Sequence, residues 1–417
     1  MVDEERVRLG TADGAVARSA EALGADVLAR LTAFEGGAGP VRVLNGTGVI
    51  VHTNLGRAPW PAAAIRAAAA AASGPLFLEL DRATGQRGRR FREAEDHLVA
   101  LTGAEDALIV TNNAAALALA MGLAGRGGVV VSRGELIEIG GGVRIPEIVR
   151  RAGAKLVEVG TTNRTRVADF EEVLAAGKAR LVLRVHPSNF RQEGFTEAPD
   201  PAGLAVAAHA HGALVVDDLG SGALLDTAAF GLVHEPTPAE RLVAGADLVT
   251  FSGDKLVGGP QAGFVVGRAD LIARLRRDPL ARAMRPDKTI LAAVAATLGL
   301  YRAGVAVREV PVWRQIALSV DAVEARARTI AAAIDGVRVV ETEATVGGGS
   351  LPGETLPSRG VALPGRATTI LARLRAGSPA VVGRIERDEV VVDLRTIEPA
   401  DDEALIGAIR AAVAGRG

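Results

Sequence analysis

The chain has 417 residues, of which 48% are apolar and 23% are charged, and its formal net charge is −1. This length is typical of one large domain with a smaller companion, and the balanced charge gives no overall electrostatic case for a nucleic-acid binder, although a local arginine patch can still bind phosphates. The chain has no cysteine, which excludes disulfides, thiolate nucleophiles and cysteine-based metal sites, and we expect no metal in its site.

The first 40 residues are rich in alanine and end in a Gly-rich breaker at 36–40, so we predict one or two helices in a short N-terminal segment, 1–40. This segment carries seven acidic residues against four arginines, and acidic surface repels phosphate. Its first residues are charged and lack the apolar run of a signal peptide, and the apolar run at 114–124 is too short to span a bilayer. We therefore expect a cytoplasmic protein.

Short apolar runs alternate with helical patterns between residues 41 and 305. Most of the runs are continuous in Val, Leu and Ile, which is typical of parallel strands covered on both faces. The runs lie at 107–111, 128–132, 155–159, 180–185, 213–217, 247–251 and 263–267, and helical patterns between them include 113–124 and 201–211. This alternation predicts an α/β domain over 41–305, with a mostly parallel sheet and helices on both of its faces.

The remainder of the chain has a different pattern. Alanine-rich stretches at 289–335 predict long helices, and shorter strands follow at 337–341, 380–386 and 389–394 before a final helix that starts at Asp401. We therefore predict a smaller α+β domain over 306–417.

Lysine is rare in this chain, and one lysine has unusual surroundings. The four lysines are Lys155, Lys178, Lys255 and Lys288, and the other basic residues, apart from six histidines, are arginines. Lys255 follows the apolar run 247–251 on a loop of small residues, which favours a lysine at the end of a buried strand. An amine can lose its proton and form a Schiff base with an aldehyde cofactor, whereas a guanidinium cannot. The alternative is a surface lysine in a turn.

Polar residues follow several of the predicted strands, where open α/β sheets bind ligands. Asn112, Asn113 and Ala114 open a helix after strand 107–111, and the free N–H groups of a helix start can bind phosphate, although Asn112 can equally be a simple N-cap. Asp217 and Asp218 follow strand 213–217, and one carboxylate there can pair with a protonated ring nitrogen. Adjacent residues of a strand point to opposite faces, so we choose Asp218, which heads the loop; an ordinary Asp turn is the alternative.

Weaker signals come from other loops and from two groups of arginines. Polar loops that offer hydroxyls and amides include Thr161 and Thr162 after strand 155–159, and His186, Ser188 and Asn189 after strand 180–185. Arg282 and Arg285 share one face if that segment is helical, which suits an anionic substrate group; structural ion pairs with Asp278 or Asp287 are the alternative. The basic run that ends at Arg92 can be a solvated helix face; its members are Arg82, Arg87, Arg89, Arg90 and Arg92.

Several long motifs, taken in order, resemble bacterial selenocysteine synthases, the L-seryl-tRNA(Sec) selenium transferases. The motifs lie at 45–57, 132–141, 158–164, 251–263, 282–288, 383–385 and 393–395, and the resemblance runs from about residue 41 to the C-terminus. It implies a fold-type-I enzyme with pyridoxal 5'-phosphate bound to Lys255 and with Asp218 as the partner of the pyridine nitrogen. It also implies further cofactor contacts from Asn112, Asn113, Ala114 and Ser252, and a pocket for the selenium donor and the aminoacyl group lined by Arg57, Thr161, Thr162, Arg282 and Arg285.

The activity implied by this resemblance is β-replacement on seryl-tRNA(Sec): hydroxide is eliminated, and selenium from selenophosphate is added to give selenocysteinyl-tRNA(Sec). The family also implies self-association as a dimer or a ring of dimers, for which the 45–57 segment and the run 82–92 are our candidate contacts. Family members carry a longer tRNA-binding segment before the 45–57 motif, and the short acidic segment here is a poor clamp for RNA. Two alternatives stay open, a lyase or aminotransferase acting on a small amino or sugar acid, and a catalytically idle paralogue.

Overall fold

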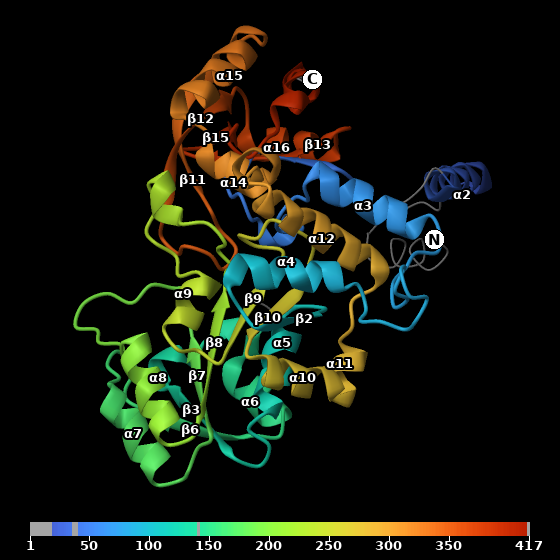
Figure 1. The fold of residues 1–417 in the computed structure, drawn as a ribbon. Helices are drawn as coiled ribbons and strands as arrows, with labels where there is room; N and C mark the ends of the chain where they lie inside the picture. Colours follow the sequence, from blue (N-terminus) through green and yellow to red (C-terminus); the bar gives the residue numbers. More distant parts are fainter. Residues whose placement is uncertain (1–18, 36–40, 140–141, 415–417) are drawn as a thin grey trace.

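The structure, a computed structural model, describes residues 19–35, 41–139 and 142–414 (Figure 1). A seven-stranded sheet forms its centre, with the strand order β2-β10-β9-β8-β7-β3-β6. All pairings are parallel except those of β10, which runs antiparallel to β2 and to β9. The strands are β2 (Asp106–Val110), β3 (Gly128–Ser132), β6 (Lys155–Val159), β7 (Leu181–Val185), β8 (Leu214–Gly220), β9 (Leu248–Ser252) and β10 (Gly263–Gly267). The predicted α/β fold with a mostly parallel sheet is confirmed, and every predicted strand of this region is present.

Both faces of this sheet are covered by helices, which explains why its strands are apolar at nearly every position. On one face, Leu108 and Val129 pack against helices α5 (Asn113–Gly122), α6 (Ile145–Arg151) and α10 (Ala269–Arg277). The side chains that alternate with them, such as Ile109 and Val130, face the opposite helices. Those helices are α4 (Arg92–Thr102), α7 (Val167–Ala175), α8 (Pro201–Ala210) and α12 (Lys288–Arg302).

A second, antiparallel sheet lies in the C-terminal part of the chain, in the order β11-β12-β15-β14. Its strands are β11 (Arg338–Thr345), β12 (Thr355–Leu363), β14 (Arg384–Glu386) and β15 (Glu389–Asp393), and β13 (Ala380–Val382) pairs separately with β1 (Val43–Asn45) in parallel. Helices α15 (Val320–Ala332), α16 (Ala367–Ala376) and α17 (Asp402–Ala414) supply apolar side chains to its core. Strand β12 was not predicted, because Pro357 and Gly360 interrupt its apolar pattern.

The remaining elements are short or peripheral: α2 (Ala20–Glu35), α3 (Ala62–Ala72), α9 (Pro238–Val243), α11 (Pro279–Ala283), α13 (Ala306–Glu309), α14 (Pro311–Ala317), β4 (Glu138–Ile139) and β5 (Val143–Arg144). Helix α2 accounts for part of the predicted N-terminal helical segment, and the rest of that prediction lies outside the described residues. Over the ranges that the structure describes, no helix combines the length and apolarity needed to cross a membrane. The domain boundaries at 41 and 305 stay predictions.

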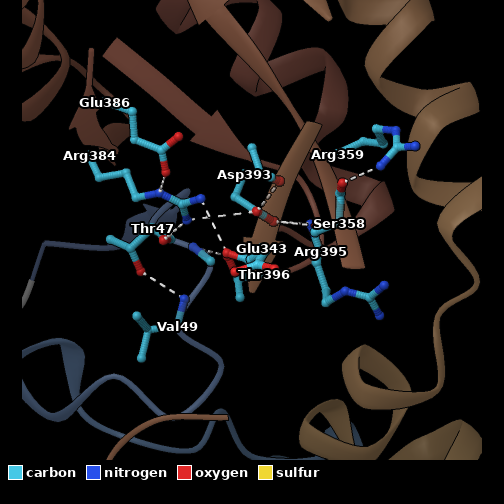
Figure 2. A network of polar contacts seen from close by, with 12 residues as sticks. Thr47, Val49, Glu343, Ser358, Arg359, Arg384, Glu386, Asp393, Arg395 and Thr396 are labelled. Atoms are coloured by element: carbon cyan, nitrogen blue, oxygen red, sulfur yellow. Dashed lines mark hydrogen bonds and ion pairs between the residues drawn. The ribbon is translucent and has the colours of Figure 1, made fainter. Parts of the chain in front are cut away.

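The segment at 43–51 joins the front of the chain to the C-terminal sheet through a buried polar network (Figure 2). The carboxylate of Asp393 is fully buried and accepts hydrogen bonds from Thr342 Oγ1 at 2.6 Å and Ser358 Oγ at 2.9 Å. Arg384 reaches the same carboxylate at 3.8 Å and donates to the carbonyl oxygen of Thr47. Because a buried carboxylate is costly unless it is fully bonded, this network fixes where the 43–51 segment lies.

Candidate active site

A cavity of about 420 Å³ lies at the end of the central sheet where the loops after β8 and β9 emerge. Its walls include Asp218 from β8, Lys255 from the loop after β9 and Asn113 from the start of α5. Two segments distant in sequence close it, one through Arg57 and the other through Gly349. Ligand sites of open α/β sheets form at such strand ends, so residues predicted separately from three strands meet in one place.

Lys255 is nearly buried, with 9% of its surface exposed, and its Nζ donates to the carbonyl oxygen of Gly349 at 3.4 Å. Position 349 has a φ of +78°, which favours glycine, and a Cβ atom there would lie 2.7 Å from Nζ, so a side chain would displace the amine from this contact. Burial lowers the pKa of the Lys255 amine, and the charge of Arg57 lowers it further, against an opposing effect of neighbouring carboxylates. The amine is therefore a better nucleophile near neutral pH than an exposed lysine.

The backbone that follows Lys255 is held from behind by Tyr301, the only tyrosine in the chain. Its buried hydroxyl lies 2.8 Å from the carbonyl oxygen of Val257 and 3.1 Å from that of Leu256, and it accepts a hydrogen bond from Trp313 Nε1 at 2.6 Å. Helices α12 and α14 thus fix the loop on which Lys255 lies.

Asp218 is buried, and its Oδ1 accepts hydrogen bonds from Asn113 Nδ2 at 2.7 Å and Thr250 Oγ1 at 2.8 Å. Burial raises the pKa of this carboxyl, while the two hydrogen bonds and the charge of Lys255 act in the opposite direction. Asp217 points to the other side, where it lies 3.5 Å from Arg241 in a separate small cavity. The geometry therefore supports the choice of Asp218 over Asp217.

The start of α5 offers free backbone N–H groups to the cavity. Asn112 is its N-cap, and the Asn112 side chain accepts from the backbone N–H of Ala115 at 2.9 Å. The backbone N–H groups of Asn113 and Ala114 are thereby left to bind a ligand. Gly263 allows this arrangement, because a Cβ atom there would lie 2.0 Å from the carbonyl oxygen of Asn112. The amide oxygen of Asn113 is buried and has no hydrogen-bond partner among the described residues. A phosphate group fits the free donors of this helix start.

Arg57 reaches the cavity through a strained turn and is bound to a buried carboxylate. Its φ is +65°, unusual for a residue with a side chain, and its Nη1 lies 2.9 Å from Asp254 Oδ2. Such strain is costly and is typically found at functional sites. Asp254 adjoins Lys255 in sequence and was not singled out beforehand, because an acid beside a lysine carries no distinctive pattern.

Replacing Arg57 with alanine should move the reaction of Lys255 with an aldehyde to higher pH. The guanidinium lowers the pKa of the amine, and its loss also leaves the Asp254 carboxylate unpaired, so both changes raise the Lys255 pKa. With a higher pKa, the amine is already protonated at a higher pH, so the variant needs a more alkaline solution to react. The pH dependence of Schiff-base formation between the protein and an aldehyde measures this, and an unchanged or lower midpoint in the variant would contradict the expectation.

Some predicted site residues lie away from this cavity within one chain. Thr162 lines a separate cavity of about 110 Å³, and Thr161 donates its hydroxyl to the carbonyl oxygen of Arg164 nearby. Arg282 is exposed on α11, and Arg285 pairs with Glu79 at 3.2 Å. The acids suggested as alternative partners have other roles, since Asp278 caps α11 and Asp287 caps α12. Ser252, in contrast, lines the Lys255 cavity.

The residues of the cavity fit a cofactor that has an aldehyde, a ring nitrogen and a phosphate. Lys255 supplies the amine, Asp218 a buried carboxylate across the cavity, and the start of α5 a set of free N–H donors. The Asn113 amide oxygen, which has no hydrogen-bond partner among the described residues, can accept a hydrogen bond from a ligand in this cavity. The absence of a side chain at Gly349 leaves space beside Lys255.

A profile for the L-seryl-tRNA selenium transferase family matches residues 43–398 of the chain. An L-seryl-tRNA(Sec) selenium transferase from Hyphomonas neptunium is 46% identical over 383 residues, which cover 89% of this chain and 82% of that protein. The protein of the same description from Carboxydothermus hydrogenoformans is 44% identical over 366 residues, or 85% and 78% of the two chains.

Among solved structures, a D-glucosaminate-6-phosphate ammonia-lyase superposes with a TM-score of 0.65. The alignment covers 92% of this chain and 98% of the other, at 21% sequence identity. At that level of identity the similarity concerns the fold alone.

Proposed function

The chain belongs to the L-seryl-tRNA selenium transferase family, a family of pyridoxal-phosphate-dependent enzymes, and we propose that it converts L-seryl-tRNA(Sec) into L-selenocysteinyl-tRNA(Sec) with selenophosphate as the selenium donor. The observation that carries the proposal is the buried Lys255 amine, which shares its cavity with the Asp218 carboxylate and the free N–H groups of α5. The chain is 46% identical to the selenium transferase of Hyphomonas neptunium but only 21% identical to the ammonia-lyase, which favours seryl-tRNA(Sec) as the substrate.

Each group of the cavity has a separate task in this reaction. Pyridoxal phosphate, when bound, supplies an electron sink for negative charge at the α-carbon of the seryl group. Asp218 would hold the proton of the ring nitrogen, and the N–H groups at the start of α5 would hold the phosphate. The Lys255 amine, once free, is the base that takes the α-proton, and burial favours its unprotonated state. The Gly349 carbonyl oxygen, which accepts from Nζ, can orient this amine.

The charges around the cavity also fit an esterified amino acid. Arg57 is the arginine that lines the cavity, and its guanidinium is already bound to both oxygens of Asp254. A free amino acid would bring a carboxylate that needs its own cation, whereas a seryl ester brings none. This arrangement supports an aminoacyl-tRNA over a small amino acid as substrate.

Incubation of the purified, cofactor-loaded protein with seryl-tRNA(Sec) and selenophosphate tests the proposal. Mass spectrometry of the amino acid released from the tRNA should find selenocysteine. Parallel reactions with free serine and with small amino or sugar acids should show no turnover. Turnover of a free acid but not of the seryl-tRNA would favour a lyase or aminotransferase, and no turnover of any substrate would favour an idle paralogue.

Arg282, Arg285, Thr161 and Thr162 are proposed to bind the selenium donor and the aminoacyl group, although they lie outside the Lys255 cavity of a single chain. Self-association as a dimer or a ring of dimers would allow residues from one subunit to complete the site of another. Light scattering of the purified protein tests this, and a fully active monomer would contradict it. Because aminoacylated tRNA is a cytoplasmic substrate, we place the activity in the cytoplasm.

The Arg282→Ala variant should slow selenium addition more than hydroxide elimination. The donor is a compact phosphate-bearing anion, and a charge-assisted hydrogen bond contributes about 1.5–3 kcal/mol, or roughly 10- to 100-fold in rate. Arg285→Ala should behave in the same way, with an added loss of stability because Glu79 loses one of its partners. Comparing the rates of the two half-reactions in each variant measures this. Equal losses in both half-reactions would mean that these arginines maintain the fold or bind tRNA instead.

A further inference from the structure

A partly exposed imidazole and a buried carboxylate form a pair beside the Lys255 cavity, and this pair has no role in the mechanism above. His186 lines the cavity, and its Nε2 lies 3.2 Å from Glu235 Oε1. Glu235 is only 3% exposed, and its Oε1 has no well-aligned hydrogen bond among the described residues. A carboxylate oxygen that is buried without such a bond is costly, so its place beside an imidazole calls for an explanation.

Hydrogen bonds hold the backbone of the loop that bears Glu235. Thr227 is fully buried, and its hydroxyl donates to the carbonyl oxygen of Val233 at 2.6 Å and accepts from the backbone N–H of Glu235 at 2.8 Å. Thr237 then caps helix α9 in a capping box with Glu240. The backbone of the loop is therefore tied down on both sides of Glu235.

His186 is equally well fixed, and it follows the strand next to the one that bears Asp218. The backbone N–H of His186 donates to the carbonyl oxygen of Asp218 at 2.9 Å, and its carbonyl oxygen accepts from the N–H of Ser188 at 2.7 Å. Glu235 is also close enough to Lys255 for its charge to raise the pKa of that amine, against the effect of burial. The pair is thus part of the same site as Lys255, although Glu235 itself lies behind the imidazole.

Under the proposed function, two protons must move in the elimination half-reaction. Lys255 takes the α-proton, and the departing seryl oxygen needs a proton because hydroxide is a poor leaving group. When the two transfers coincide, one amine cannot both take the α-proton and give a proton to the leaving oxygen. A second proton donor in the cavity would remove this conflict.

We propose that His186 gives a proton to the leaving seryl hydroxyl and that Glu235 is the positioning residue that holds the ring for this transfer. The inference rests on the proposed function. The electron pair of the Cα–H bond forms the second Cα–Cβ bond, the Cβ–O pair leaves with the oxygen, and the proton from His186 converts that oxygen into water. His186 regains its proton from solvent. The loose alignment with Glu235 fits a contact that tightens only when substrate is bound.

The test compares two substrates that differ only in the leaving group. Seryl-tRNA(Sec) loses a hydroxyl that must be protonated, whereas 3-chloroalanyl-tRNA(Sec) loses chloride, which needs no proton. The rate of elimination can be followed by trapping the unsaturated acyl group with a thiol and measuring the product by mass spectrometry. His186→Asn should slow elimination from the seryl substrate by about 10²–10³-fold and that from the chloroalanyl substrate by less than about fivefold. Glu235→Gln should give the same selectivity with a smaller loss.

Two further measurements separate this role from a structural one. Both variants should bind pyridoxal phosphate with unchanged affinity and absorption spectrum, and both should exchange the α-hydrogen of alanyl-tRNA(Sec) with D₂O at the normal rate, because alanine has no leaving group. The adjacent pair of His234 and Glu240 is a matched control, since it is also an imidazole–carboxylate pair but is exposed. His234→Asn should leave elimination from both substrates unchanged.

The outcomes distinguish a failure of the role given to His186 from a failure of the proposed function. Equal losses with both tRNA substrates, or slowed α-hydrogen exchange, would overturn the role of His186 while leaving the proposed function intact. Full activity of His186→Asn on seryl-tRNA(Sec) would do the same. If the unsubstituted enzyme fails to eliminate from seryl-tRNA(Sec), the proposed function fails, and this inference fails with it.

Discussion

Replacing Lys255 with alanine should give a folded protein that loses covalent attachment of pyridoxal phosphate and at least about 10³-fold of its activity. Lys255 is the one lysine that lines the cavity, and its loss removes both the attachment point and the base for the α-proton. Folding should not suffer, because burial already disfavours the charged amine. Borohydride reduction followed by peptide mapping of the unsubstituted protein should find the cofactor on this residue.

The other lysines and small amines provide the controls for this experiment. Lys155 and Lys178 are exposed, and Lys288 donates to the carbonyl oxygen of Gly74, so none of them should carry the label. A small primary amine such as methylamine should restore part of the activity of Lys255→Ala, because the shortened side chain leaves space for it. Label on another lysine, or full activity of the alanine variant, would show that the assignment of the reactive amine is wrong.

Asp218→Asn should still bind the cofactor but should slow α-proton removal by on the order of 10²-fold or more, since an amide does not hold a proton on the ring nitrogen. The substitution keeps the size of the side chain and an oxygen that can accept from Asn113 and Thr250. Exchange of the α-hydrogen of seryl-tRNA(Sec) in D₂O measures the affected step directly. A normal exchange rate would exclude Asp218 as the partner of the ring.

The same variant should be more stable than the unsubstituted protein in the absence of cofactor. Burial raises the folded-state pKa of Asp218, so the folded protein binds this proton more tightly than the unfolded chain does. Stability is therefore lost as the pH rises from the unfolded value, about 3.9, through the folded value, and asparagine removes that loss. In thermal unfolding of cofactor-free protein, the variant should exceed the unsubstituted protein in stability by more at about pH 8 than at about pH 4. The reason is that Asp218 loses its proton between these two pH values, and asparagine has no proton to lose.

Asp217→Asn is the matched control for both measurements. Asp217 is buried beside Arg241 on the far side of the strand, so its loss should destabilise the fold by on the order of 3 kcal/mol and leave α-proton exchange nearly unchanged. If this variant instead shows the larger loss of exchange, the roles of the two aspartates are reversed.

The central sheet could be predicted from sequence because both of its faces are buried, which makes each strand a short apolar run with polar residues at its end. Lys255 and Asn113 were predicted for the same reason, since each lies shortly after such a strand, whereas Asp218, predicted to head a loop, lies within β8 near its end. Strand β12 was missed, because its partners and not its own composition stabilise a strand that contains Pro357.

Other parts of the site depend on contacts between distant segments, which no local pattern reveals. Glu235 lies on a loop between two helical turns and reaches His186 only in the folded chain. Gly349 looks like any residue of a Gly-rich turn until Lys255 is placed against it. The position of Thr162 was also not predictable, because a residue after a strand can face either of two neighbouring cavities.

The anchoring of the 43–51 segment has a consequence for the order in which the protein is made on the ribosome. Strand β1 pairs with β13, and Arg384 and Asp393 fix the backbone near Thr47, so the segment that leads to Arg57 is bound by residues synthesised more than 300 positions later (Figure 2). Strand β8, which carries Asp218, and strand β9, which precedes the loop of Lys255, are complete well before that point. A nascent chain therefore acquires the reactive lysine early, whereas the backbone that leads to Arg57 is anchored near Thr47 only when synthesis is almost finished.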